Sequence, residues 1–132
     1  MLPTVVVLYP GPMSSIDVVA TTPAELGEGP LWSADEQVLY WIDIDGRAIH
    51  RYDPSADTDE LRSTPGRPGS LALTSRPGTL LVATEAEAVW FDWETGATRP
   101  FVDLEEPGVG VRMNDGRTDP AGRFLAGSMF ED

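Results

Sequence analysis

The sequence contains no cysteine among its 132 residues, and only 9 basic residues stand against 22 acidic ones, which gives a formal net charge of −13. Without thiols the chain forms no disulfide, no thiolate metal site and no cysteine nucleophile. Because it has no basic stripe, we expect neither nucleic acid nor a membrane surface among its partners. The acidic residues are spread along the chain, which is typical of a solvated surface.

Long hydrophobic runs are also missing. The first ten residues are apolar, but they carry no basic leader, are interrupted by prolines and fall far short of the roughly 20 residues of a membrane-spanning helix. They therefore predict neither an export signal nor an anchor. Since Pro-Gly-Pro at 10–12 is followed directly by Met13, we expect residues 1–14 to be a poorly ordered leader and the domain to occupy residues 15–132. The lack of cysteine fits the cytoplasmic location that we expect, without requiring it.

What the chain does contain is a series of short apolar runs, rich in valine, leucine and aromatic residues and separated by clusters of Gly, Pro, Asp and Ser. No stretch shows a long helical period, so the pattern predicts an all-β fold. The expected strands are Ile16–Thr21, Val38–Ile44, Ala48–Asp53, Glu60–Thr64, Ser70–Leu73, Leu80–Thr84, Ala88–Asp92, Thr98–Phe101 and Arg123–Ser128.

A repeat becomes visible when the turns are aligned. A polar turn comes before apolar runs that contain Leu39, Leu80 and Phe124, so the unit recurs after roughly 40 to 45 residues, the length of a four-stranded propeller blade. The chain holds about two and a half such units, whereas propellers close with at least about four. We therefore expect an open arc of blades, a fragment whose exposed blade faces need further blades or a complementing chain. A single β-sandwich with regularly spaced turns is the alternative.

Three segments carry a resemblance to a known family: Leu26–Trp32, Leu39–Ile44 together with Ile49–Asp53, and the long run Arg112–Met129. On these segments the chain resembles the SMP-30/gluconolactonase (regucalcin-like) family. The resemblance implies a six-bladed β-propeller of roughly twice this length, of which the chain is the amino-terminal two to three blades. It also implies one divalent metal ion (calcium, zinc, magnesium or manganese) at the mouth of the central channel. The substrate that we expect is a small-molecule sugar lactone, although related members hydrolyse other lactones or organophosphates.

The same resemblance assigns roles to four residues. Glu28 matches the family's glutamate metal ligand, and a carboxylate between two glycines suits a hard cation; the alternative is an exposed acid in a Gly-Pro turn. Arg112 and Asn114 match the substrate-contacting pair, since arginine donates a planar fork and an amide both donates and accepts. Two apart on an extended segment, they face the same side. A surface ion pair and an Asn-Asp-Gly turn are their alternatives. Asp132 matches an acidic residue near the substrate.

The catalytic base and the remaining metal ligands belong, by the same resemblance, to later blades, so no catalytic residue is assigned in this chain. One protein carboxylate is too few for firm binding of a hard cation. We therefore expect metal-dependent hydrolysis of sugar lactones from the complete propeller, and weak metal binding with negligible activity from this chain alone. The alternative function is a non-enzymatic calcium-binding or protein-interaction segment.

Further expectations concern placement. Both motifs, around Glu28 and around Asn114, are expected in loops that lead into strands, with Asp115 forming a turn or orienting a neighbour. His50, the only histidine, is expected on a strand surface. The four tryptophans are expected to pack between sheets rather than bind a sugar: Trp32, Trp41, Trp90 and Trp93.

Overall fold

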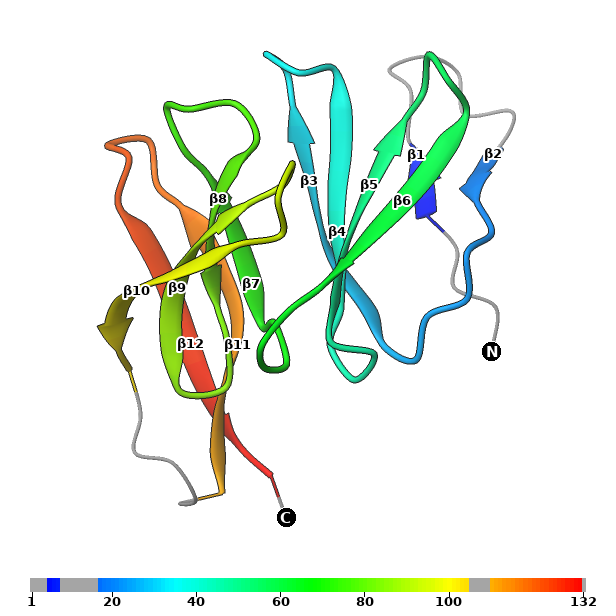
Figure 1. Ribbon diagram of the computed structural model, residues 1–132. Coiled ribbons are helices and arrows are strands. Elements are labelled where there is room, and N and C mark those ends of the chain that lie inside the picture. Colours follow the sequence, from blue (N-terminus) through cyan, green and yellow to red (C-terminus); the bar gives the residue numbers. More distant parts are fainter. Residues whose placement is uncertain (1–4, 8–16, 105–109, 132) are drawn as a thin grey trace.

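The computed structural model describes residues 5–7, 17–104 and 110–131, and in this part of the chain all regular structure is β-strand. The strands form two four-stranded antiparallel sheets, one hairpin and one short ribbon (Figure 1). They are Val5–Val7 (β1), Asp17–Ala20 (β2), Gly27–Ser33 (β3), Val38–Asp43 (β4), Ala48–Asp53 (β5), Thr58–Ser63 (β6), Ser70–Leu73 (β7), Thr79–Ala83 (β8), Glu87–Asp92 (β9), Thr98–Asp103 (β10), Val111–Thr118 (β11) and Phe124–Phe130 (β12).

The two larger sheets are meanders in which each strand pairs with the next, in the orders β3-β4-β5-β6 and β7-β8-β9-β10. The hairpin β11-β12 begins a third sheet in the same way. Leu39, Leu80 and Phe124 lie at or next to the first residues of β4, β8 and β12, the second strand of each sheet. The repeat in the sequence is therefore a structural repeat of blade-like sheets.

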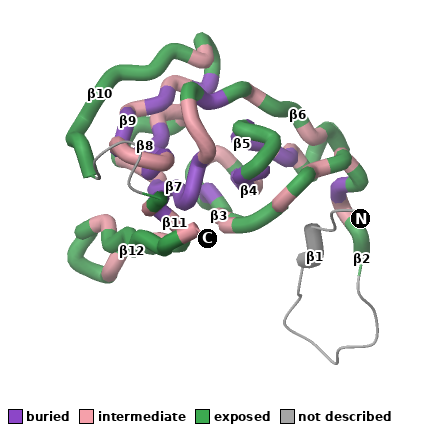
Figure 2. The backbone as a smooth tube through the Cα atoms, turned by 90° about the horizontal axis from the view of Figure 1, so that it is seen from below, coloured by how far each residue is buried: buried purple, intermediate pink, exposed green. Residues whose placement is uncertain are grey.

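The hydrophobic core lies between the first two sheets and is built mainly from β4, β5, β8 and β9, which carry most of the buried positions in Figure 2. The fully buried aliphatic side chains alternate along their strands, as Leu80 and Val82 do on β8. Strands β10 and β12 are mostly exposed. The inner strands of the sheets are thus rigidly supported, whereas the outermost strands face solvent.

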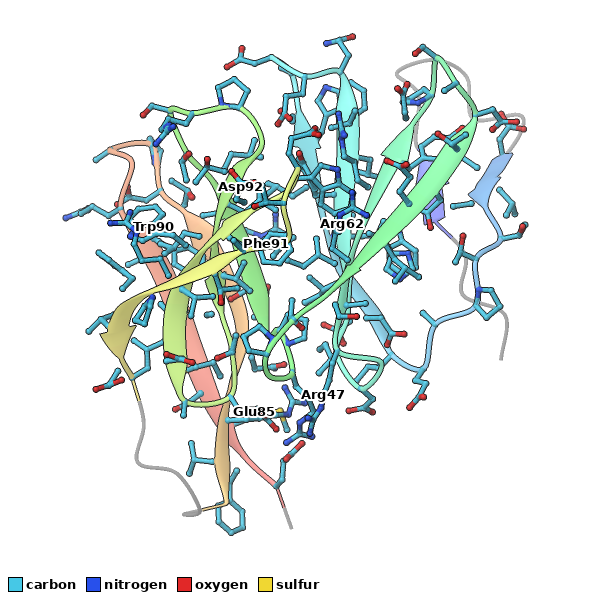
Figure 3. The ribbon with its side chains drawn as sticks, in the orientation of Figure 1. Arg47, Arg62, Glu85, Trp90, Phe91 and Asp92 are labelled. Atoms are coloured by element: carbon cyan, nitrogen blue, oxygen red, sulfur yellow. The ribbon has the colours of Figure 1, made fainter. Side chains whose placement is uncertain are left out.

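Trp93, which directly follows β9, connects the second sheet to the first. Its side chain is only 1% exposed, and its ring meets the ring of Tyr40 edge-on at 5.7 Å. The guanidinium groups of Arg62 and Arg51 lie 5.3 and 5.7 Å from the Trp93 ring, and Arg62 Nε donates a hydrogen bond to the Trp93 carbonyl oxygen (3.2 Å). Figure 3 shows Arg62 reaching from β6 toward the segment that follows β9.

The first strands of the three sheets, β3, β7 and β11, converge, with β7 in contact with both others (Figure 2). Gly69, immediately before β7, permits this approach, because a Cβ atom there would lie 2.5 Å from the Met113 carbonyl oxygen of β11. The first strands therefore line a common centre, which is where a propeller has its channel.

The nine strands expected from the sequence all occur, with ends displaced by about two residues or fewer. The expectation that the two motifs lie in loops was wrong, because they lie inside β3 and β11. Both strands carry an irregularity at the motif, between Glu28 and Leu31 and between Met113 and Gly116. Gly29 has a φ of 61°, so the bulge in β3 uses a residue type that otherwise signals a turn.

Part of the expected leader is a strand, since Val5–Val7 pairs antiparallel with Asp17–Ala20. The other residues of the segment 1–14 lie outside the described residues, as does Asp132. Within the described ranges we find no helix with the length and apolar character needed to cross a membrane.

Candidate functional site

The two motifs meet at one small cavity between the first strands of the three sheets. The cavity has a volume of about 120 Å³ and is lined by Gly29–Leu31 of β3, by Ser70 and Leu71 of β7, and by residues 115–118 of β11. Glu28 directly precedes the lining segment of β3, and Asn114 directly precedes that of β11. Segments some 85 residues apart in the sequence therefore border the same space.

Glu28 lies at the start of β3, in register with Ile42 of β4. Its side chain is exposed and forms no hydrogen bond or ion pair with the described part of the chain. A carboxylate without a protein partner keeps its lone pairs available for a ligand. Glu28 is thus free to bind a cation.

Asp43, the last residue of β4, fixes the segment that leads to Glu28. Its Oδ1 accepts hydrogen bonds from the backbone N–H groups of Leu26 (2.9 Å) and Gly46 (3.0 Å), and its Oδ2 accepts one from Glu25 (3.0 Å). Burial by itself would raise the pKa of Asp43, but these three donors outweigh burial and lower the pKa. The ionised Asp43 therefore anchors the entry into β3.

The described residues supply only part of a metal site. No three of their histidine, aspartate or glutamate side chains gather closely enough to hold an ion. A calcium ion takes roughly six to eight oxygen ligands, and Glu28 can provide at most two of them. The donor chemistry of Glu28 fits a hard cation, but the described residues are too few to hold one without further ligands.

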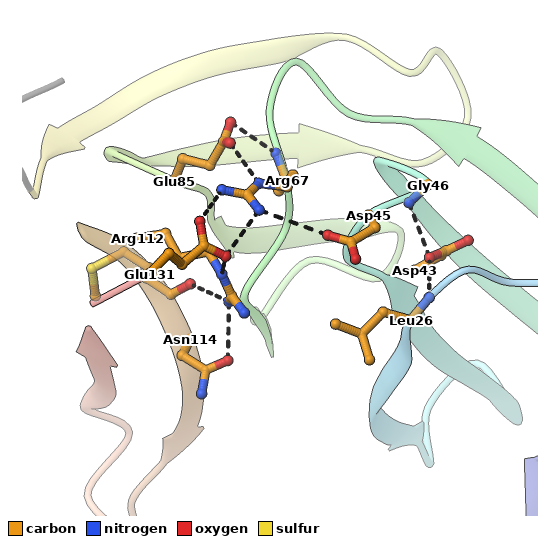
Figure 4. Close-up of polar contacts among 10 residues, drawn as sticks. Leu26, Asp43, Asp45, Gly46, Arg67, Glu85, Arg112, Asn114 and Glu131 are labelled. Atoms are coloured by element: carbon orange, nitrogen blue, oxygen red, sulfur yellow. Dashed lines mark hydrogen bonds and ion pairs between the residues drawn. The ribbon is translucent and has the colours of Figure 1, made fainter. Parts of the chain in front are cut away.

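Arg112 and Asn114, on β11, lie on the same side of the strand and are joined by a hydrogen bond. Arg112 Nη1 donates to Asn114 Oδ1 (3.1 Å) and to the Met113 carbonyl oxygen (3.2 Å), and the Arg112 side chain is buried (Figure 4). The amide oxygen of Asn114 accepts from Arg112, and its NH₂ group, which has no hydrogen-bond partner among the described residues, is the donor that Asn114 offers to a ligand. Arg112 does form the ion pair that its alternative predicts, with Glu131, but its side chain is buried; Asn114 lies within β11, at the irregularity of that strand.

The carboxylate of Glu131, just after β12, lies between two arginines. Its Oε1 accepts from Arg112 Nε (2.6 Å) and from Arg67 Nη1 (3.0 Å), and its Oε2 accepts from Arg67 Nη2 (2.6 Å). Hydrogen bonds from Arg67 and then Arg112 lower the pKa of Glu131 to about 2. Arg67, which lies in no motif, was not identified from the sequence, and the resemblance led only to Asp132, the residue after Glu131.

The structure also tests the expected positions of His50, Asp115 and the tryptophans. His50 is not on the surface: it is 1% exposed, its ring stacks on that of Trp41 at 3.7 Å, and its Nδ1 lies 2.8 Å from Asp59 Oδ2. Asp115 supports the bulge of β11 by accepting a hydrogen bond from the Gly116 N–H (2.8 Å). Of the tryptophans, Trp32 contradicts the expectation of packing between sheets, because 45% of it is exposed.

Comparisons with known proteins agree with this arrangement. The family model described as SMP-30/Gluconolactonase/LRE-like region matches residues 26–132 of this chain. Regucalcin of Xenopus laevis is 34% identical over 122 residues, which are 91% of this chain and 40% of that protein. L-arabinolactonase of Azospirillum brasilense is 36% identical over 122 residues, with the same two coverages of 91% and 40%.

A solved structure of a related protein has the same fold over most of this chain. The crystal structure of a calcium-binding protein, regucalcin, from Agrobacterium tumefaciens superposes with a TM-score of 0.79 at 28% identity, covering 85% of this chain and 38% of that one. Such neighbours are six-bladed propellers, so the sheets described here are consecutive blades of that fold. The chain spans about 40% of the length of the curated relatives that it matches.

Proposed function

Because this chain belongs to the SMP-30/gluconolactonase/LRE-like family, we propose that it is the amino-terminal part of a hydrolase that opens sugar lactones once further blades complete the propeller. One observation carries the proposal: the buried Arg112 orients Asn114, and the β11 residues that follow Asn114 line a cavity together with the β3 residues that follow Glu28. The lactonases among the relatives support the reaction class.

Arg112 and Asn114 would bind the substrate. The remaining N–H groups of Arg112 and the NH₂ group of Asn114 are donors held on one side of a rigid strand. Hydroxyl and carbonyl oxygens of a sugar lactone are acceptors for such donors. Donors that are fixed before the reaction also stabilise the oxyanion that forms when water attacks the lactone carbonyl. Asp132 is proposed as a further substrate contact on the family resemblance alone.

Glu28 would be one ligand of a divalent cation, which is calcium, zinc, magnesium or manganese. When bound, such an ion polarises the lactone carbonyl. The exposed, unpartnered carboxylate of Glu28 supports this role, and the small number of ligands in the described residues implies that the rest come from elsewhere. On its own, the chain is therefore expected to bind metal weakly and to have negligible lactonase activity.

The decisive experiment measures gluconolactone hydrolysis, with each of the four metals added, by the protein completed with carboxy-terminal blades. Glu28→Gln should lower kcat/KM by more than the roughly 10- to 100-fold that is typical for loss of an outer partner of a metal ligand. Glu60→Gln, an exposed glutamate on the outer strand β6, is the matched control and should leave activity unchanged. Activity of Glu28→Gln equal to that of the control would remove the metal assignment.

The blades that complete the propeller would dock on the β11-β12 hairpin. Among the described strands β12 pairs only with β11, and its side chains Leu125, Met129 and Phe130 are 61%, 38% and 65% exposed. An unpaired edge and an apolar face are the surfaces that a propeller buries against the rest of the blade and its neighbour. The docking segment is either a continuation of this chain or a separate complementing chain.

A second candidate function is calcium binding without catalysis, which the Agrobacterium structure favours because it is described as a calcium-binding protein. The hydrolysis assay, combined with calorimetry of calcium binding, separates the two functions. A completed protein that binds calcium in calorimetry but hydrolyses no sugar lactone would support the non-enzymatic function and contradict the first proposal.

A further inference from the structure

A chain of ion pairs connects three sheets at the end of the molecule where the motifs lie, and it includes an arginine that no motif contains. Arg67 lies in the connection from β6 to β7. Its Nε donates to Glu85 Oε1 (2.6 Å) in the β8–β9 turn, and its two terminal nitrogens donate to the two carboxylate oxygens of Glu131 (3.0 and 2.6 Å). Asp45 of the first sheet adds a longer contact with Arg67 Nη1, at 3.7 Å. Figure 4 shows these groups converging on Arg67.

The backbone around Arg67 is held in place. The Arg67 N–H donates to Glu85 Oε2 (3.2 Å), Pro68 is fully buried, and the Gly69 N–H donates to the Ala83 carbonyl oxygen (2.7 Å). With its main chain fixed and one edge of its guanidinium on Glu85, Arg67 has little freedom to turn. It presents its other edge to Glu131 as a two-point clamp of the kind that sets the plane of a carboxylate.

The orientation of Glu131 in turn decides that of Arg112. The Glu131 side chain is 36% exposed, and within the described residues its only side-chain partners are Arg67 and Arg112. Glu131 Oε1 accepts from both, so the clamp of Arg67 fixes the atom that receives Arg112 Nε (2.6 Å). With Nε fixed, Nη1 of Arg112 is directed at Asn114 Oδ1 (3.1 Å).

We infer that Arg67 is a positioning residue for the substrate site: through Glu131 it holds the guanidinium of Arg112 in the orientation that also orients the amide of Asn114. The inference rests on the proposed function for the meaning of that site, but the geometric relay does not depend on catalysis. It adds a residue of the blade connection to a site whose other members lie on β3 and β11 or follow β12.

The test uses the 132-residue chain and reads Arg112 directly. In a sample labelled with ¹⁵N-arginine, the Nε–H signal of Arg112 is identified by its loss in Arg112→Lys, and its exchange with solvent is measured. Arg67→Met should speed this exchange by about tenfold or more, the change expected when a hydrogen bond to a charged group is weakened. Arg67→Lys, which keeps the charge but loses the clamp, should give an intermediate rate. Arg123→Met removes an ion pair with Asp119 at an exposed site and should leave Arg112 unchanged.

Glu85→Gln provides a second route that leaves Arg67 intact and only loosens its anchor; it should also speed the exchange of Arg112, by a smaller factor. A backbone amide spectrum shows whether each variant stays folded, and if Arg67→Met does not fold, Arg67→Lys and Glu85→Gln decide. Exchange of Arg112 within twofold of the parent chain in the folded variants would overturn the inference. An absence of lactonase activity in the completed protein would contradict the proposed function and leave this result unaffected.

Discussion

At the scale of single residues, the hydrogen bond between Arg112 and Asn114 separates two roles that one amide could play. Asn114→Asp keeps an oxygen that accepts from Arg112 Nη1 (3.1 Å) and replaces the NH₂ donor by a carboxylate oxygen, which pairs with the same guanidinium. If that donor binds the substrate, kcat/KM for gluconolactone in the completed protein should fall by about 100-fold, the usual effect of losing one preorganised donor. Thermal unfolding should be nearly unchanged, because the internal contact survives. Asn114→Asp with full activity would show that the NH₂ group has no role in binding.

Some residues of the site could be predicted from the sequence, and others could not. Glu28, Arg112 and Asn114 could be found because each lies in a short motif of characteristic residue types. Arg67 could not, because its partner Glu131 is 64 residues away and their meeting depends on how three sheets are placed. His50 was misjudged for a similar reason: a strand position next to a charged residue does not reveal that Asp59 and Trp41 will enclose it.

At the scale of strands, the contact between the first two blades includes one large, fully buried side chain, that of Trp93. Trp93→Ala should lower the free energy of unfolding by about 3–5 kcal/mol, since a buried aromatic ring is replaced by a cavity. Trp93→Phe should cost less, because a ring remains for Tyr40 and Arg62 to contact. Trp32→Ala, at a site that is 45% exposed, is the control. Urea denaturation measures all three, and equal losses for Trp93→Ala and Trp32→Ala would contradict this account of the interface.

Strand prediction succeeded where the residue types are typical of a strand alone. It failed where the same residue types are typical of both a turn and a bulged strand. Regular strands such as β5 and β7 alternate or run apolar between clear turns, and their bounds follow from the sequence. In β3 and β11 the residues Gly29, Pro30, Asn114, Asp115 and Gly116 have the composition of a turn. A bulge in the innermost strand of a blade requires the same residue types, so only the pairing with β4 and β12 distinguishes a bulge from a loop.

At the scale of the whole molecule, all described carboxyl groups with shifted pKa values have lowered values, so their protonation changes stability in the same direction. The pKa values of Asp43, Asp59, Glu85 and Glu131 are all lowered, in each case by hydrogen bonds that the folded structure provides. For Asp59, burial would raise the pKa, but donors on His50, Thr22 and Trp41 outweigh it. Each group therefore binds protons more weakly in the folded chain than in the unfolded chain, and stability must fall as these groups are protonated.

This linkage competes with the net charge of −13, whose self-repulsion weakens the compact state near neutral pH. Mild acidification should therefore change stability little, or raise it slightly, until the pH reaches the unfolded-state pKa of the carboxyls, about 4. Below that pH the contribution of the paired carboxylates is progressively lost, and for Glu131 the loss continues to a pH of about 2. Urea midpoints measured from pH 7 to pH 2 should show a plateau and then a steep decline.

Asp59→Asn removes one of these carboxyls and should make the decline shallower, whereas Asp35→Asn, in the exposed β3–β4 turn, should not. A decline of unaltered steepness in Asp59→Asn would show that acid unfolds the chain through its overall charge and not through its paired carboxylates.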